Sequence, residues 1–373
     1  MSKARRPALF EVFPATIGKL HHLSLGRTPT PLDIHAGDGL DFDCAQLLIK
    51  RDDQSADAYG GNKIRKLEFL LADARAGGAR GVITFGVAGS NHALATTVCA
   101  SQCGLESYSL LTRQTNASYV RRNLLCGHHA GARLMACENE ADAAATSRRL
   151  VAEAQALGEP LYVIAGGGSS TIGCLGFVSA GLELAAQLSE AGLEPPELIY
   201  LALGTVGTAA GLQLGLRLAG LDTRLVPIRV VREDIGSPER FRRLYRGTLD
   251  LLRTVARQPL KVDADEVPAI RHDFVGPGYA RFTTEGMAAI EQARRWFGLP
   301  LDPTYTGKAF AALLADLRAG RLHGRRVMFW DTYSSRPLPP AALAADYHQL
   351  PAPFHWYFEQ PVQPLDPGAS PGG

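Results

Sequence analysis

A regular alternation of short apolar segments with helical ones, between residues 81 and 165, constrains the fold of this chain more than any other feature. The apolar segments have the length of buried strands, and the stretches between them carry apolar residues at helical spacing. We expect strands at Gly81–Phe85, Ser107–Leu111, Ala132–Ala136 and Leu161–Ala165, and helices at Asn91–Cys103, Tyr119–Cys126 and Ala141–Leu157. Elements that change type every ten to fifteen residues or so are typical of βαβ units, so a compact parallel sheet is predicted here.

Longer elements of the same kinds flank this segment. We expect strands at Cys44–Lys50, Leu198–Leu203, Arg224–Val231 and Arg326–Trp330, and helices at Ile172–Ala191, Pro238–Arg257 and Thr283–Trp296. We therefore predict an α/β fold of two three-layer units with largely parallel sheets. Residues 1–65 and 166–355 are assigned to a larger unit and residues 66–165 to a smaller inserted one. Residues 1–40 are expected to be irregular, and the Pro- and Gly-rich residues 356–373 to be loosely ordered.

The composition excludes several classes of partner. The 373 residues are 46% hydrophobic and 20% charged, as in a globular protein, and their net charge of +2 is too small for a nucleic-acid or membrane-surface binder. There is no run of eighteen apolar residues and no apolar leader, so we expect a cytoplasmic protein without a membrane span. The six cysteines form no C-x-x-C pair and the ten histidines are scattered, so we predict no metal site.

The first candidate for chemistry is Lys63, in the segment Y-G-G-N-K-I-R-K-L-E-F. Two glycines allow a tight turn, and the helical pattern that follows should end at Gly77–Gly78. Lys63 therefore lies at a loop-to-helix junction, where an amine can form a Schiff base with a carbonyl cofactor. The alternative is that Lys63, Arg65 and Lys66 form a solvated basic face at the start of a surface helix.

The second candidate is an anion site at Gly204–Thr208, where an apolar strand runs into G-T-V-G-T and then a helix. Backbone N–H groups and the helix N-terminus favour a phosphate there, and Thr205 and Thr208 add hydroxyls. The motif lacks the P-loop lysine and the dinucleotide glycine spacing. The alternatives are a simple βα turn that needs glycine, and a rival anion loop at Gly166–Ser170.

Four further polar residues lie on glycine-shaped loops. Ser90 and Asn91 follow a strand and a glycine turn, although either could be no more than a helix N-cap. Tyr279 in G-P-G-Y and Tyr305 in D-P-T-Y-T-G-K can donate or accept a proton, although both could simply pack with a wetted hydroxyl.

Taken in order, the motifs G-G-N-K-x-R-K-L-E, G-S-N-H, G-T-x-G-T-x-A-G, G-P-G-Y and L-D-P-x-Y-T-G-K-A resemble those of one family. It is the family of 1-aminocyclopropane-1-carboxylate (ACC) deaminase and D-cysteine desulfhydrase, pyridoxal-phosphate (PLP) enzymes of the tryptophan synthase β-subunit fold, also called fold type II. The resemblance covers roughly residues 25–335 and implies PLP as the cofactor.

The resemblance implies a role for each matching residue. Lys63 matches the Schiff-base lysine, which also moves the substrate Cα proton; Asn91 matches the residue that bonds the cofactor's phenolic oxygen. Ser90 matches a catalytic hydroxyl that binds the substrate carboxylate, and Tyr279 and Tyr305 match the two active-site tyrosines. The phosphate cradle is matched by Gly204, Thr205, Val206, Gly207 and Thr208.

Position 306 divides the family. ACC deaminases have Glu there, which keeps the ring nitrogen protonated, whereas desulfhydrase-like members resemble this chain in having Thr306. A threonine hydroxyl suits elimination of a good β-leaving group better than ring opening. The chain also departs from the family at Gly89, where Gln is usual, and at Asp331–Ser335, where H-T-G-G is usual. Thr306, Asp331 and Thr332 therefore remain alternatives for the group that faces the pyridine nitrogen.

We predict a PLP-dependent lyase or deaminase that acts on a small amino acid by D-cysteine desulfhydrase-like β-elimination, releasing a keto acid and ammonia. A cytoplasmic homodimer is expected. One alternative is ACC deaminase itself, which Thr306 disfavours. An alternative of another class is a non-catalytic α/β small-ligand-binding protein that uses the Gly204 loop and leaves Lys63 solvated.

Overall fold

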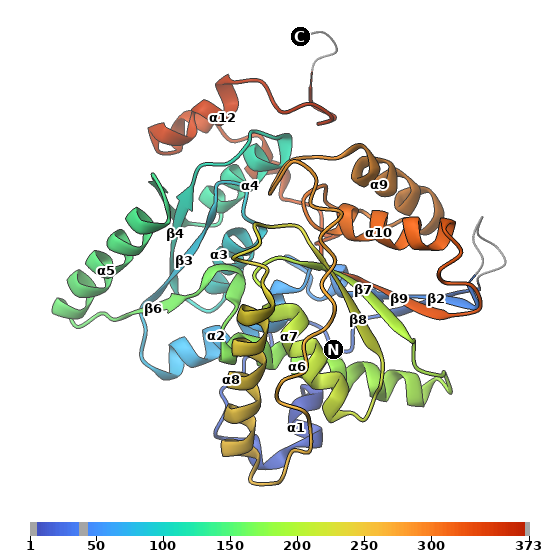
Figure 1. Cartoon of the computed structure of the whole chain (residues 1–373). Helices are drawn as coiled ribbons and strands as arrows, with labels where there is room; N and C mark the ends of the chain where they lie inside the picture. The colour runs from blue at the N-terminus through green and yellow to red at the C-terminus, as the bar shows by residue number, and fades with distance from the viewer. Residues whose placement is uncertain (1–5, 37–43, 370–373) are drawn as a thin grey trace. The chain divides into compact units, whose positions relative to one another are not determined.

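The computed structural model describes residues 6–36 and 44–369, and these residues form two compact units, each built from two separate stretches of chain (Figure 1). Unit 1 comprises Met1–Phe69 and Ser169–Ser335, and unit 2 comprises Leu70–Gly168 and Arg336–Gly373. Residues 336–355, which the sequence analysis assigned to the larger unit, therefore group with the smaller one.

Unit 1 contains a five-stranded sheet in the order β1-β2-β9-β7-β8. Its strands are β1 (Leu32–Ala36), β2 (Gln46–Arg51), β7 (Leu198–Leu203), β8 (Arg224–Arg229) and β9 (Arg326–Asp331). All neighbours pair in parallel except β1, which pairs antiparallel to β2. The sequence analysis expected residues 1–40 to be irregular and missed β1, because the apolar–polar alternation of L-D-I-H-A extends over only five residues and directly follows a Pro-rich stretch. The carboxyl ends of the four parallel strands meet at one edge, where ligands bind in such sheets.

Helices cover both faces of this sheet. One core contains side chains of α1 (Ala8–Val12), α6 (Thr171–Glu190), α7 (Gly207–Leu218) and α8 (Pro238–Ala256), and the other contains those of α9 (Thr284–Phe297) and α10 (Thr306–Arg318). Strand β9 serves both cores, because Met328 and Trp330 face the first while Val327 and Phe329 face the second. Helix α6 has the length and hydropathy of a membrane span, but 72% of that window is buried inside the structure, as in the core helix of a folded domain.

Unit 2 contains a four-stranded parallel sheet in the order β5-β4-β3-β6. Its strands are β3 (Gly81–Val87), β4 (Glu106–Thr112), β5 (Ala132–Cys137) and β6 (Leu161–Ile164), and the helices between them are α3 (Asn91–Gln102), α4 (Ser118–His129) and α5 (Glu140–Ala156). Helix α2 (Lys63–Ala76) begins in unit 1 and ends in unit 2. The prediction of an α/β fold with largely parallel sheets is confirmed.

The C-terminal segment, residues 336–369, packs within unit 2. It contains the short helices α11 (Pro340–Leu343) and α12 (Trp356–Glu359), both of which contact α4 (Figure 1). Tyr357 is 2% exposed and Asp366 is 5% exposed. The expectation of a loosely ordered tail is therefore wrong for residues 356–369, because side chains of unit 2 bind a backbone that has little regular structure of its own; residues 370–373 lie outside the described part.

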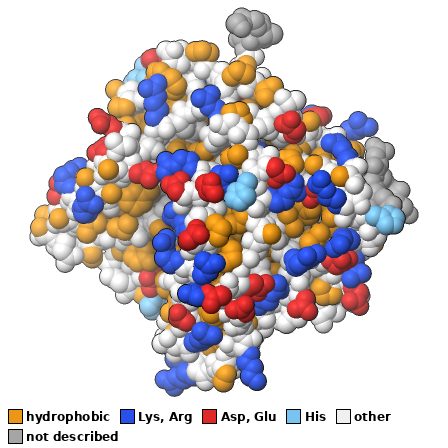
Figure 2. Space-filling model, viewed as in Figure 1, with side chains coloured by type: hydrophobic (Ala, Val, Ile, Leu, Met, Phe, Trp, Pro, Cys, Tyr) orange, Lys and Arg blue, Asp and Glu red, His pale blue; other side chains and the backbone are white. Residues whose placement is uncertain are grey.

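On the face drawn in Figure 2, acidic and basic side chains are interspersed, in keeping with the net charge of +2.

Candidate functional site

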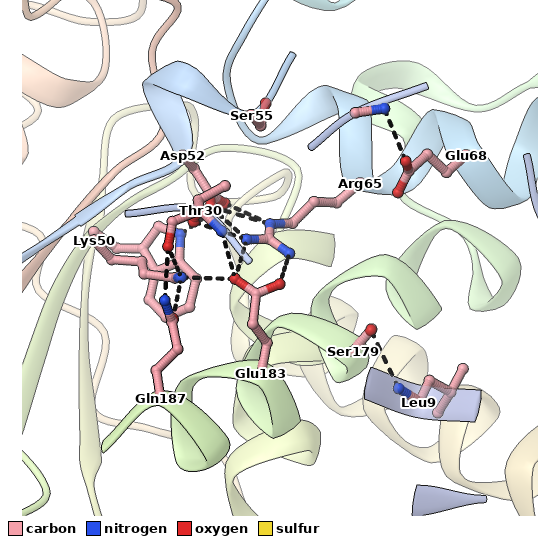
Figure 3. Close-up of polar contacts among 12 residues, drawn as sticks. Leu9, Thr30, Lys50, Asp52, Ser55, Arg65, Glu68, Ser179, Glu183 and Gln187 are labelled. Carbon is pink, nitrogen blue, oxygen red and sulfur yellow. Dashed lines mark hydrogen bonds and ion pairs between the residues drawn. The ribbon is translucent and has the colours of Figure 1, made fainter. Parts of the chain in front are cut away.

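The start of α2 is fixed by a buried ion cluster, which we define as Lys50, Asp52, Arg65 and Glu183 (Figure 3). The Arg65 guanidinium donates to Asp52 at 2.8 Å and to Glu183 at 2.8 Å. Lys50 Nζ donates to Glu183 Oε1 at 2.6 Å. Two cations thus balance two carboxylates, and these residues come from β2, α2, α6 and the turn after β2.

The charges of the ion cluster stabilise one another. Burial alone would raise the pKa of Glu183, but Arg65 and Lys50 outweigh it and hold that pKa at about 2. The Trp330 indole N–H also donates to Asp52 Oδ2 at 2.9 Å, so the cluster is hydrogen-bonded as well as neutral overall. Because Arg65 lies two residues after Lys63, the cluster fixes the backbone that carries the Lys63 amine.

The turn before α2 is bonded to the ends of two other strands. Gly61 has a φ of +91°, and an added Cβ would lie 2.8 Å from the Tyr333 carbonyl oxygen, so only glycine fits. Asn62 N donates to the Thr332 carbonyl oxygen at 3.1 Å, and Asn62 Nδ2 donates to Thr208 Oγ1 at 2.9 Å. Lys63 is therefore held beside the loops that follow β9 and β7.

Lys63 is partly buried at the first position of α2. Its pKa is lowered to about 7, by burial first and then by the charge of Lys66, while Asp302 opposes the shift. A substantial share of the Lys63 amines is then uncharged at neutral pH, and an uncharged amine is a nucleophile. The alternative of a solvated basic face is wrong for the neighbouring cations, because Arg65 is 2% exposed and Lys66 is 1% exposed.

The predicted anion loop connects β7 to α7. Val206 precedes α7 in the left-handed conformation, with a φ of 59°, which is uncommon for a β-branched residue. Within the described residues, no side chain caps α7, whereas Ser170 caps α6 by accepting from Gly173 N. Gly207 N donates to the Thr205 carbonyl oxygen at 2.9 Å, which leaves the N–H groups that follow it in the first turn of α7 for an anion and favours Gly204–Thr208 over the rival loop at Gly166–Ser170.

The rival loop nevertheless contributes Ser169, which the sequence analysis did not single out. Ser169 Oγ lies 2.7 Å from Thr205 Oγ1, and Lys66 Nζ lies 3.4 Å from Ser169 Oγ. A Cβ on Gly207 would lie 2.6 Å from Ser169 Oγ, so glycine is required for this approach. Burial lowers the pKa of Lys66 to about 8. The sequence signal for Lys66 was its spacing from Lys63, since residues three apart lie on one face of a helix.

The two predicted tyrosines meet. Tyr279 OH and Tyr305 OH lie 2.5 Å apart, and a Cβ on Gly204 would be 3.2 Å from Tyr305 Cε1, so the Tyr305 ring lies against the anion loop. Burial raises the pKa of Tyr279 to about 12, although its hydrogen bond with Tyr305 opposes the shift. Tyr279 is therefore protonated at neutral pH.

Thr306 is tied to Asp302, another residue that the sequence analysis did not single out. Asp302 Oδ1 accepts from Tyr305 N at 2.7 Å and from Thr306 N at 2.8 Å. Thr306 Oγ1 in turn accepts from Asp302 N at 2.8 Å. This reciprocal pair fixes the first turn of α10, and its sequence signal is the acidic residue of L-D-P-T-Y-T.

Asp331 and Thr332 end β9. Asp331 is fully buried, its Oδ1 accepts from Tyr333 N at 3.1 Å, and its Oδ2 has no hydrogen-bond partner among the described residues. Burial and the nearby charge of Asp53 raise the pKa of Asp331 well above its usual range. Thr332 is partly exposed.

Ser90 and Asn91 belong to unit 2, at the start of α3. Ser90 Oγ caps the helix by accepting from Ala93 N at 3.1 Å, and Asn91 Oδ1 accepts from Asn123 Nδ2 at 2.9 Å.

Within unit 1, the structure brings together Lys63, the Gly204–Thr208 loop, Tyr279 and Tyr305. In the part of the chain that is described, no group of three or more His, Cys, Asp or Glu side chains could hold a metal ion.

Comparison with known proteins identifies relatives that match most of the chain. The sequence pattern of the family described as "Pyridoxal-phosphate dependent enzyme" matches residues 23–332. The D-cysteine desulfhydrase of Salmonella paratyphi C is 34% identical over 315 residues, which cover 82% of this chain and 92% of that enzyme.

Solved structures agree with this match. The crystal structure of an ACC deaminase homologue is similar with a TM-score of 0.73 and 29% identity, covering 88% of this chain and 95% of that one. A fungal L-serine ammonia-lyase from Rhizomucor miehei is similar in fold, with a TM-score of 0.56, 16% identity and coverage of 87% and 97%.

Proposed function

Since the chain belongs to the family of pyridoxal-phosphate dependent enzymes, we propose that it catalyses a β-elimination like that of D-cysteine desulfhydrase. The protein is a PLP-dependent lyase or deaminase. In the proposed reaction a small amino acid loses its Cα proton and its β-substituent, which leaves with the bonding electron pair. Addition of water then yields a keto acid and ammonia. The observation that carries the proposal is Lys63, an amine with a pKa of about 7 beside an anion loop.

The residues of unit 1 fit the cofactor. Helix α7 begins without a side-chain cap among the described residues, and glycine at position 207 keeps the loop close to Ser169. We propose that the backbone N–H groups of this turn and the hydroxyls of Thr205 and Thr208 hold the phosphate. The buried Lys66 amine would offset part of the phosphate charge. The proposed cradle comprises Gly204, Thr205, Val206, Gly207 and Thr208.

We propose which residues of the chain move the protons of this reaction. Bound PLP provides an electron sink for the charge that develops at the substrate Cα. Lys63 Nζ is the proposed base for the Cα proton, because its amine is uncharged in part at neutral pH. Tyr279 and Tyr305 are the proposed donors to the leaving group, because Tyr279 keeps its proton well above neutral pH. From unit 2, we propose Asn91 for the cofactor's phenolic oxygen and Ser90 for the substrate carboxylate, as the sequence resemblance implies.

The group at the pyridine nitrogen separates two candidate functions. We propose that Thr306 and Thr332 lie on that side of the cofactor, which leaves the ring nitrogen without an ionised carboxylate and suits β-elimination. The second candidate is ACC deamination. It is favoured by the buried carboxyl group of Asp331, whose pKa is raised by burial and by the charge of Asp53, and whose Oδ2 has no partner in the described residues. An acidic group that reached the ring nitrogen would strengthen the electron sink.

We also propose a cytoplasmic homodimer, as the family resemblance implies. Size-exclusion chromatography with light scattering should then give twice the 40.0 kDa of one chain. A mass of 40.0 kDa at working concentration would contradict the dimer.

One experiment tests the function. The purified protein should absorb visible light, and borohydride reduction followed by peptide mapping should place the pyridoxyl group on Lys63. Lys308 is the internal control, since its Nζ already donates to the carbonyls of Val275 and Gly278. Keto-acid release should then be compared for D-cysteine, β-chloro-D-alanine, their L-isomers and ACC. A β-substituted substrate is expected to exceed ACC, while the opposite ranking would favour ACC deamination and would implicate Asp331.

A further inference from the structure

The C-terminal segment lies beyond residues 23–332, the part matched by the family pattern, yet it is closely packed. Ala342, Phe354 and Tyr357 are each at most 2% exposed. Asn116 Nδ2 donates to the Tyr357 carbonyl oxygen at 2.9 Å, and Arg121 Nε donates to the same oxygen at 2.7 Å. The segment is thus an integral part of unit 2.

A chain of hydrogen bonds runs from this segment to the loop before α3. Tyr357 OH accepts from Gln114 N at 3.0 Å. The Gln114 side chain then accepts from Gly89 N through Oε1 at 2.8 Å, and its Nε2 donates to Tyr119 OH at 2.7 Å. Because Gly89 N is a donor, the acceptor end of the Gln114 amide must face it.

Gly89 has no room for a side chain of its own. An added Cβ would lie 2.7 Å from Tyr119 Cε2, 2.9 Å from Val120 Cγ2 and 3.0 Å from Gln114 Oε1. This explains why the chain departs from the family pattern at position 89. The Gln114 amide occupies this space and bonds the Gly89 backbone instead.

The other side of the loop is bonded to α4. Asn123 Nδ2 donates to the Gly89 carbonyl oxygen at 2.9 Å and to Asn91 Oδ1 at 2.9 Å. The second bond assigns the acceptor end of the Asn91 amide to Asn123, so its donor end, Nδ2, points the other way. The Gly89 N–H therefore depends on Gln114, which Tyr357 contacts, and the Gly89 carbonyl and the Asn91 amide depend on a residue of α4, the helix against which α11 and α12 pack.

We propose that the C-terminal segment positions the cofactor-binding end of α3, with Tyr357 acting through Gln114 on Gly89. This inference rests on the proposed function, because it gives Asn91 its cofactor-binding role. Tyr357 and Gln114 are positioning residues, since they act through the loop before α3. A donor held in one orientation before the cofactor arrives loses less entropy on binding.

The test compares Tyr357→Phe with Tyr162→Phe in the full-length holoenzyme. Tyr162 is a matched control, because its hydroxyl donates to Asp73 at 2.9 Å, in the same unit but away from Gly89. Amide hydrogen exchange of residues 86–93 should rise in Tyr357→Phe only. The Kd for PLP should increase about 3- to 10-fold, the effect of one lost hydrogen bond. KM for the substrate should change less than Kd for PLP.

Two further variants test Gln114, the residue between Tyr357 and Gly89 in this series of hydrogen bonds. Gln114→Ala should weaken PLP binding more, about 10- to 30-fold, because it leaves Gly89 N unpaired. Gln114→Glu should restore binding, because a carboxylate can accept from both Gly89 N and Tyr119 OH. A wild-type protein that retained no PLP would refute the proposed function itself. A PLP-loaded protein in which Tyr357→Phe and Gln114→Ala behaved like Tyr162→Phe would refute the positioning role alone.

Discussion

The helices that begin at the two proposed cofactor contacts, α2 at Lys63 and α3 at Asn91, are fixed by different forces. In unit 1 the start of α2 is fixed by the ion cluster, with two buried cations against two buried carboxylates. In unit 2 the loop before α3 is fixed by neutral amides, those of Gln114 and Asn123. Breaking a buried ion pair leaves an uncompensated charge, whereas one neutral hydrogen bond is worth about 1 kcal/mol. The backbone at the proposed nucleophile, Lys63, thus depends on a few strong contacts, and the proposed ligand amide of Asn91 depends on several weak ones.

Helices α7 and α3 both follow glycine turns, but their N-termini are capped differently. Ser90 caps α3, so its first N–H groups are partly satisfied from within. Helix α7 has no side-chain cap among the described residues and begins after Val206 in a left-handed conformation. A similar strand–glycine–helix pattern therefore precedes the proposed anion site in one unit and the proposed cofactor-binding amide of Asn91 in the other.

The largest effect is expected at the amine that the ion cluster positions. Lys63→Ala should lower turnover by about 10³-fold or more, because it removes both the covalent contact to PLP and the proposed base. The α7 turn should still retain PLP without a covalent bond. Rapid-mix assays of keto acid and the visible spectrum after dialysis would measure the two effects. Lys63→Ala protein with wild-type turnover would overturn the assignment.

Arg65→Met should cost about 3–5 kcal/mol of unfolding free energy, because it leaves Asp52 and Glu183 buried without their shared partner. The matched surface control is Arg149→Met, which removes an exposed pair with Glu153 worth at most about 0.5 kcal/mol. Urea titrations of both variants would measure the difference. Equal losses would show that α2 does not depend on the ion cluster.

Acid should loosen α2 before it loosens α3. The pKa of Glu183 is held at about 2, below its usual 4.5, so the folded state favours its ionised form. The stabilisation is present above about pH 4.5 and is lost as the pH falls toward 2, to a total of about 3 kcal/mol at most. Hydrogen exchange, corrected for its intrinsic pH dependence, should increase first in residues 63–76. Earlier loosening of residues 114–123 would contradict this order.

Gly207→Val should weaken PLP binding about 10- to 100-fold, because the new side chain would collide with Ser169. Reconstitution of apoprotein, followed by absorbance, would give the Kd. A control is Gly220→Val, at an open position after α7 that lies away from Ser169; its φ of +73° gives this variant a backbone strain that Gly207→Val lacks, so weaker PLP binding in Gly207→Val alone would not be a strain effect. Unchanged affinity in folded Gly207→Val protein would move the phosphate cradle to Gly166–Ser170.

Much of the local structure could be predicted from periodicity and glycine placement. Strand β7 was expected at Leu198–Leu203 and has those bounds, and α2 ends at Ala76, just before the expected stop at Gly77. The predictions of an α/β fold, a PLP enzyme and the family are confirmed. Strand β1 was missed because its apolar–polar alternation covers only five residues. The C-terminal segment could not be predicted in this way, because irregular backbone has no apolar period.

The sequence by itself determined the order of strands and helices, the turn before Lys63 and the glycine loop before α7, since each depends on residues close together in the chain. Only the tertiary structure decided which residues from distant parts of the chain meet. Arg65 pairs with Glu183, 118 residues away, and Tyr357 meets Gln114 across 243 residues. The same packing made Lys66, a surface cation in the alternative interpretation of the sequence, a buried amine beside Ser169. Local patterns cannot encode such partners, because contacts between distant segments arise only when the sheets and helices pack.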